Sequence, residues 1–154
     1  MSRAQRSARE AGRGRTGAPA LDGNLMFLAR FAGPLMLLAR AMLAYIFVAD
    51  AWTQIGTYSE VADYMRQNGV APALLPLVIV TQLGGGLLVL LGLATRWAAI
   101  ALWGYCLLTA IFFHLGADQT VHFQKNIAMA GGFLTLAIFG PGPWSLDAWR
   151  GRAS

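Results

Sequence analysis

Eight residues with polar or charged side chains interrupt the apolar stretches of this sequence or stand at their ends, and they are its candidates for a binding site. They are Arg40, Asp50, Gln54, Gln82, His114, His122, Lys125 and Asn126. A charge inside a membrane span costs about 2.5–3.5 kcal/mol on insertion scales, so such residues are functional candidates by default. Arg40 and Gln54 share a helical face, and Asp50 precedes Gln54 by one turn. We therefore expect a polar stripe directed into a helix bundle.

Two of these residues also have purely structural interpretations. Arg40 stands seven residues into an apolar stretch, so its long side chain could reach the cytoplasmic headgroups, an interpretation as good as a buried role. Gln82 lies near mid-depth of the second stretch and needs a hydrogen-bond partner in hydrocarbon. By depth we expect that partner to be Asp50, directly or through water. The simpler role for Gln82 is an interhelical bond that only holds the bundle together.

The two histidines flank a polar loop at the outer end of the molecule. His114 and His122 are of a type that binds metal or haem, or passes protons. The sequence lacks the tighter HExxH or paired-cysteine spacing of metal sites, so we predict no metal. We interpret the cluster as polar residues closing an outer mouth, with Lys125 paired to Asp118 or Asp50. No catalytic residue is assigned, and whether the chain is an enzyme stays open.

Composition places these residues in a membrane. The 154-residue chain is 56% hydrophobic and 12% charged, whereas soluble domains are about 25% charged. Its mean hydropathy is +0.52. Four apolar stretches suit helices of about 20 residues, the length that crosses a bilayer, and lipid requires every backbone group to be paired. We predict an all-α integral membrane four-helix bundle within residues 31–149, with spans at about 33–55, 73–93, 97–115 and 124–140.

The basic residues predict the topology. Residues 1–30 are Arg-rich and are expected to form a disordered cytoplasmic tail, and residues 150–154 a second cytoplasmic tail. Nine basic residues then lie on the cytoplasmic side, whereas the outer loops hold only Arg66 and Lys125, as the positive-inside rule requires. We predict a multi-pass membrane protein with both termini in the cytoplasm. No aromatic residue interleaves the arginines of the tail, so we predict no nucleic-acid partner.

Two further patterns concern packing. Small residues at Gly84–Gly86, and at Ala128 and Gly132, indicate sites where helices approach closely. In the long outer loop, helical spacing of apolar residues predicts an amphipathic segment that we expect on the membrane surface. Those residues are Tyr58, Val61, Tyr64 and Met65.

Several stretches in order resemble the DoxX family of small four-helix membrane proteins. QLGGGLLVLLGLATRWAA (82–99) resembles the family's acidic-LGGG segment with its following GL-T-R. KNIAMAGGFL (125–134) and GPGPWSLDAW (140–149) resemble its fourth helix and C-terminal close, and the Arg40 to Phe47 spacing resembles its first helix. The resemblance covers most of the chain. It implies a four-helix bundle in the bacterial inner membrane.

The resemblance also implies a link to redox chemistry for some relatives. These include a membrane complex with superoxide dismutase and a sulfurtransferase, and thiosulfate–quinone oxidoreduction. This sequence departs from the family pattern where a Lys–Glu pair is expected, because Gln54 and Gln82 stand there and Asp50 is nearby. Two neutral amides can hydrogen-bond across helices but cannot relay a proton.

Three functions are consistent with these observations. The first is a non-catalytic or quinone- or thiol-linked accessory subunit of a membrane redox system. No cofactor motif is evident, and a quinone or lipid in the bundle is the expected occupant. The second is a structural or assembly subunit of a larger membrane complex, and the third is a small transporter or proton path. The expected partners are membrane lipids and other membrane or redox proteins, and homo-oligomers are left open.

Overall fold

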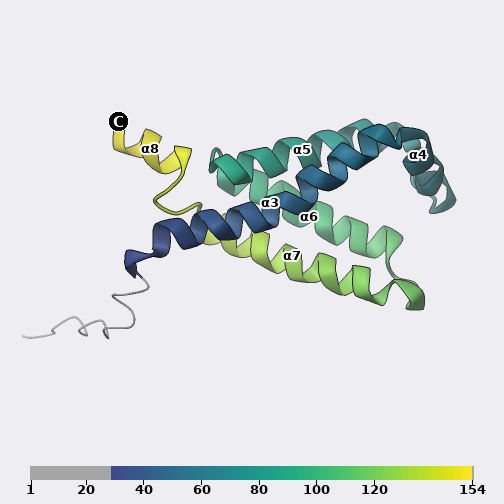
Figure 1. The fold of residues 1–154 in the computed structure, drawn as a ribbon. Helices are drawn as coiled ribbons and strands as arrows, with labels where there is room; N and C mark the ends of the chain where they lie inside the picture. The colour runs from purple at the N-terminus through teal and green to yellow at the C-terminus, as the bar shows by residue number, and fades with distance from the viewer. Residues whose placement is uncertain (1–28, 154) are drawn as a thin grey trace, which may run out of the picture. The chain divides into compact units, whose positions relative to one another are not determined.

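The computed structural model describes residues 29–153, and the part from residue 32 onward forms a bundle of helices (Figure 1). The predicted Arg-rich tail lies almost entirely outside the described residues. No strand occurs in the described part of the chain, and this confirms the all-α fold class. In chain order the elements are α3 (Ala32–Gly56), α4 (Tyr58–Gln67), the 3-10 turn η1 (Pro72–Leu74), α5 (Leu75–Leu91), α6 (Thr95–Phe113), the 3-10 turn η2 (Ala117–Gln119), α7 (Thr120–Phe139) and α8 (Leu146–Ala153).

The long helices α3, α5, α6 and α7 correspond to the four apolar stretches. Among the described residues, three helical segments are long and apolar enough to cross a membrane: α3, Pro72–Leu91 and α6. Helix α7, of 20 residues, starts at Thr120 rather than near 124, because the η2 turn leads directly into it. That α7 also crosses stays a prediction. The segment expected to be a tail from residue 150 lies mostly within α8.

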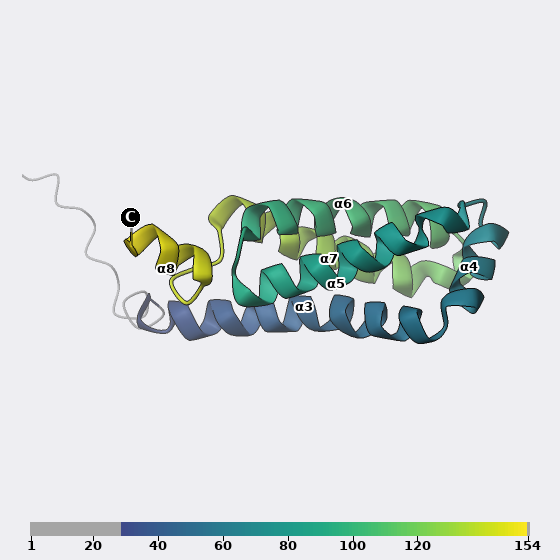
Figure 2. The same cartoon turned by 90° about the horizontal axis from the view of Figure 1, so that it is seen from above.

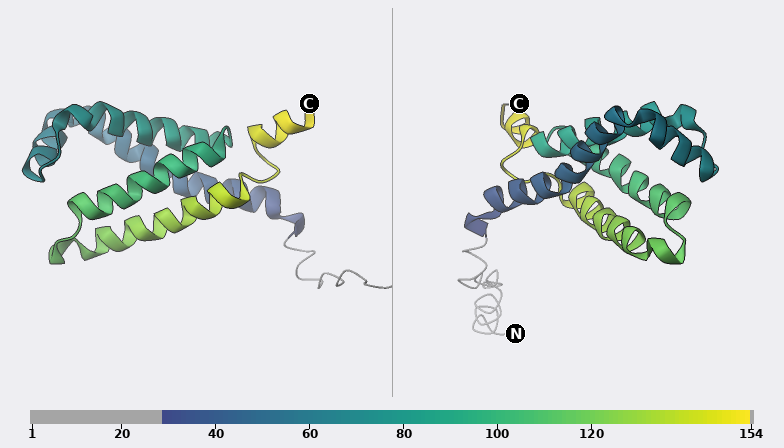
Figure 3. Two further views of the ribbon diagram at one scale, coloured as in Figure 1. Left: turned by 180° about the vertical axis from the view of Figure 1, so that it is seen from behind. Right: turned by 45° about the vertical axis from the view of Figure 1, so that its right-hand side comes forward.

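The bundle is built from two packed pairs of helices, α3 with α5 and α6 with α7. A short turn after α5 leads into α6, so these two helices also pack against each other and join the pairs. Helices α4 and α8 lie at opposite ends of the bundle (Figure 2). The two pairs diverge toward the α4 end, as the views from two sides show (Figures 1 and 3).

Glycines allow the close approach of α5 to its neighbours. A Cβ at Gly86 would lie 3.0 Å from the Val48 side chain and 3.5 Å from the Ala44 carbonyl oxygen, both on α3. A Cβ at Gly85 would lie 3.0 Å from Leu102 on α6. The predicted packing role is therefore met by these two glycines, whereas Gly84 has no atom within 4 Å of its Cβ position. Small residues at such positions let helix backbones approach in a membrane.

The apolar core sits where the two pairs cross. Phe47 on α3 meets Phe133 on α7 edge to face, with ring centroids 5.1 Å apart. Leu102 and Cys106 on α6 are fully buried beside them in one cluster. Cys106 packs in this cluster as a small apolar residue. Beyond this core, toward α4, the two helix pairs diverge (Figures 1 and 3).

Candidate functional site

A cavity of about 610 Å³ lies between the two helix pairs at the α4 end. Most of its wall is aliphatic or aromatic, but a cluster of polar side chains also faces it. The polar lining residues are Asp50, Gln54, Tyr105, Thr109, His114, Lys125 and Asn126. A concave, mostly apolar site with a few convergent polar groups is typical of sites for small molecules.

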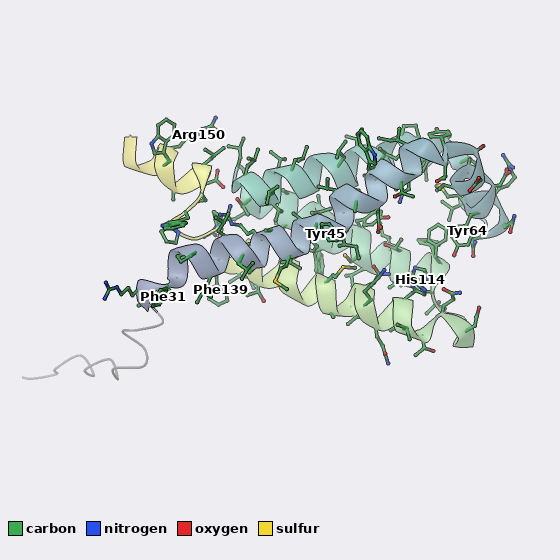
Figure 4. The ribbon with its side chains drawn as sticks, in the orientation of Figure 1. Phe31, Tyr45, Tyr64, His114, Phe139 and Arg150 are labelled. Carbon is green, nitrogen blue, oxygen red and sulfur yellow. The ribbon has the colours of Figure 1, made fainter. Side chains whose placement is uncertain are left out.

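Helix α4 covers the end of this cavity. Val61, Tyr64 and Met65 line the cavity, and Met65 is buried. The Tyr64 ring stacks on Phe113 at the end of α6, with centroids 5.5 Å apart and an interplanar angle of 19°. Tyr64 and His114 lie at the same end of the bundle, on its inner side (Figure 4). The predicted amphipathic helix is present, but its apolar face covers the cavity because the diverging helices leave apolar surface there to bury.

Gln82 joins three helices beside the cavity. Its Nε2 donates to Gln54 Oε1 on α3 at 3.2 Å and to the Tyr105 hydroxyl on α6 at 2.8 Å. The expected direct bond to Asp50 is wrong, because Gln82 Nε2 bonds Gln54 and Tyr105 instead, and a bond to Asp50 through water stays a prediction. Tyr105 was not anticipated, because nothing in the sequence aligns its hydroxyl with Gln82. Its only sequence signal is a polar-tipped ring within an apolar stretch.

Three further polar groups face the cavity without a partner. Within the described residues, no hydrogen bond or ion pair joins the side chain of Asp50, Lys125 or Asn126 to another group of the protein. Asn126 is nevertheless buried, with 6% of its surface exposed. The expected pairing of Lys125 with Asp118 is wrong, and with Asp50 it forms no ion pair, although Lys125 and Asp50 interact electrostatically. The cavity keeps a carboxylate, an ammonium and an amide available.

The two histidines form a stacked pair near the mouth of the cavity. Their ring centroids are 5.2 Å apart, and only His114 lines the cavity. His114 Nδ1 lies 3.3 Å from Gln119 Oε1. Burial lowers the pKa of His114, and the nearby charges of His122 and Lys125 lower it further, against the hydrogen bond to Gln119, which raises it. The neutral form of His114 is thus favoured.

Arg40 does not belong to the cavity. It is buried at the other end of α3, with 1% of its surface exposed. Its Nη1 donates to the carbonyls of Val89 at 3.4 Å and Leu90 at 3.3 Å, and its Nη2 donates to the Trp144 carbonyl. A cation at the last carbonyls of α5 complements the helix dipole. The interpretation in which Arg40 reaches the headgroups is wrong, because backbone carbonyls hold its guanidinium inside the protein.

Asp147 completes that end of the bundle and was missed by the sequence analysis. Its carboxylate accepts the backbone N–H groups of Ala94 at 2.8 Å and Thr95 at 2.9 Å, and the Thr95 hydroxyl at 3.0 Å. Its own N–H donates to the Gly92 carbonyl at 2.8 Å. Burial alone would raise the pKa of Asp147, but these hydrogen bonds outweigh it and lower the pKa. The available signal was Ser145 followed two positions later by an acidic residue, a combination typical of the first turn of a helix.

The fold and the cavity together define an all-α membrane helical bundle with an amphipathic binding cavity at one end. A family model described as DoxX matches residues 35–115. The chain therefore belongs to the DoxX family, as its motifs indicated.

Two bacterial relatives support this assignment. The inner membrane protein YqjF of Escherichia coli (strain K12) is 42% identical over 115 residues, which are 73% of this chain and 88% of the relative. The inner membrane protein YphA of the same organism is 33% identical over 123 residues, with 73% of this chain and 88% of the relative covered. No solved structure matches the chain. The chain is an inner-membrane protein, and the side on which each terminus lies stays a prediction.

Proposed function

We propose that this chain is an accessory subunit of a membrane redox system and that it holds an amphipathic membrane molecule, a quinone or a lipid, in the cavity. The observation that carries the proposal is the cavity itself, which combines an apolar wall with unpartnered polar groups next to predicted spans. The redox role rests on the family resemblance. The electrons would come from a partner protein.

The hydrogen bonds of Gln82 prepare two donors for a bound head group. Gln54 and Tyr105 each accept from Gln82, so the amide N–H groups of Gln54 can donate to a ligand, as can the phenol O–H of Tyr105, which also interacts with the Thr109 side chain. Both residues line the cavity. Neutral donors suit a carbonyl or phosphate oxygen. Because the amides at 54 and 82 cannot transfer protons as a titratable pair could, we assign the chain a binding role rather than a catalytic one.

The test is purification of the tagged full-length protein in a gentle detergent. Mass spectrometry identifies co-purifying proteins, and the lipid extract is analysed for quinones and phospholipids. We expect a dehydrogenase or thiol oxidoreductase in the eluate and a stoichiometric quinone or lipid in the extract. Protein that purifies alone, with neither ligand, would overturn the proposal and favour a transporter or proton path. A large complex without a bound ligand would favour a structural subunit.

Variants link the ligand to the cavity. Gln54→Leu combined with Tyr105→Phe removes both donors, and we expect the retained ligand to fall. Thr135→Val is the matched control, because Thr135 is an exposed α7 residue whose hydroxyl bonds only to the Gly131 carbonyl of its own helix, 3.0 Å away.

A further inference from the structure

Opposite charges face the cavity from its two sides without forming an ion pair in the described residues. Asp50 extends from α3 and Lys125 from α7, and both line the cavity. They interact electrostatically, but no ion pair joins them within the described residues. A charged side chain at membrane depth is costly unless it is paired. Because Asp50 and Lys125 attract each other but form no ion pair, the cavity suits an occupant that carries one charge of each sign and contacts both side chains.

The two charges belong to different helix pairs. Asp50 is part of the α3–α5 pair, whereas Lys125 and Asn126 are part of the α6–α7 pair. Lysine offers only donors, and an asparagine amide adds two more. Asn126 is buried and has no partner in the described structure, so its amide is set toward the cavity rather than used in packing. The α3 side therefore offers a carboxylate acceptor at Asp50, and the α7 side offers ammonium and amide donors at Lys125 and Asn126.

We infer that the cavity takes the head group of a zwitterionic phospholipid with a primary ammonium, of the ethanolamine class, its ammonium at Asp50 and its phosphate at Lys125 and Asn126. This inference rests on the proposed function and narrows the class of molecule that the cavity binds. A primary ammonium can donate to a carboxylate, whereas a quaternary choline ammonium cannot. A neutral quinone satisfies the amides but neither charge. The apolar wall contributed by Leu74, Leu75 and Leu108 accommodates the start of the acyl chains.

The test is native mass spectrometry of the delipidated full-length protein in detergent. It is titrated in separate arms with phosphatidylethanolamine, phosphatidylcholine, phosphatidylglycerol, a long-chain quinone and water-soluble phosphoethanolamine. We expect phosphatidylethanolamine to bind about tenfold more tightly than either other phospholipid, equivalent to ~1.4 kcal/mol. Soluble phosphoethanolamine that binds as tightly as the lipid would overturn the assignment to a lipid.

Two variants separate the two ends of the head group. Asp50→Asn should weaken the binding of phosphatidylethanolamine about tenfold and leave the affinity for phosphatidylglycerol unchanged. Lys125→Gln should weaken both lipids. The controls are Asp63→Asn and Arg66→Gln, which disrupt an exposed ion pair on α4 away from the cavity. We expect these controls to bind like the wild type.

The outcomes distinguish this inference from the function on which it rests. A quinone that binds more tightly than phosphatidylethanolamine, with no effect of Asp50→Asn, overturns the inference and leaves the proposed function standing. Binding of neither quinone nor lipid overturns both. If Asp50→Asn does not fold, Asn126→Leu tests the phosphate side alone. Unchanged binding of phosphatidylethanolamine by a folded Asn126→Leu protein would count against the inference.

Discussion

Replacing Asp147 with alanine removes the link between the C-terminal segment and the start of α6. The carboxylate accepts two backbone N–H groups and one hydroxyl from Ala94 and Thr95. Ala94 is the N-cap residue of α6, and its side chain makes no capping hydrogen bond. The variant therefore leaves the first N–H groups of α6 without their acceptor, whereas the backbone bond from residue 147 to the Gly92 carbonyl remains.

The expected loss can be estimated from capping energies. Removing an N-cap side chain costs about 0.5–2 kcal/mol. The negative charge at a helix N-terminus contributes about 0.3–1 kcal/mol more. Because Asp147 is half-buried and makes three such bonds, we expect Asp147→Ala to lower the free energy of unfolding by about 2 kcal/mol, toward the upper end of the capping range. Asp147→Asn keeps an acceptor oxygen and should lose about half of that.

The assay is reversible unfolding in mixed micelles, with helicity followed by circular dichroism. Asp63→Ala is the control, since its exposed ion pair with Arg66 should contribute less than about 1 kcal/mol. Because the folded pKa of Asp147 is lowered, its contribution is full above the ordinary carboxyl pKa, about 3.9, and disappears as the pH falls through the folded value. The difference in unfolding free energy between wild type and Asp147→Ala should thus be constant near neutrality and disappear in acid. An Asp147→Ala protein as stable as Asp63→Ala at pH 7 would refute the reasoning.

Three more perturbations have defined outcomes. Gly92→Ala should destabilise the protein by more than about 1 kcal/mol, because Gly92 has φ +69° and a Cβ there would lie 2.1 Å from Arg40 Nη1; Gly84→Ala, with nothing within 4 Å, should be neutral or stabilising in the same unfolding assay. Gln82→Leu should lower the free energy of unfolding by about 1 kcal/mol, since interhelical hydrogen bonds in membranes average about 0.6 kcal/mol each and two are removed. A loss above about 3 kcal/mol would show that Gln82 does more than join helices. Because the folded pKa of His114 is lowered, the free energy of unfolding of the wild type should fall as the pH drops below about 6.5. The same pH dependence should be flatter for His114→Phe. Equal slopes for the two proteins would contradict the assigned burial of His114.

The cavity residues show how far local reasoning extends. Asp50, Gln54, His114, Lys125 and Asn126 were singled out because polar groups in apolar stretches are costly wherever the helices pack, and all five line one cavity. Their pairings could not be derived in the same way. Depth along a helix does not specify rotation or the neighbouring helix, so Gln82 was assigned to Asp50 although it bonds Gln54 and Tyr105.

Composition and hydrophobic pattern alone determined that this is an all-α membrane protein, because a bilayer requires long apolar segments whose backbone groups are all paired. The motifs determined its family, because they are local packing and turn sequences that are visible in the chain itself. Only the tertiary structure decided that Arg40 belongs to the end opposite the cavity, that α4 covers the cavity and that Asp147 caps α6. These features join residues from 49 to 104 positions apart. Such contacts depend on how the two helix pairs diverge, and no local pattern encodes that geometry.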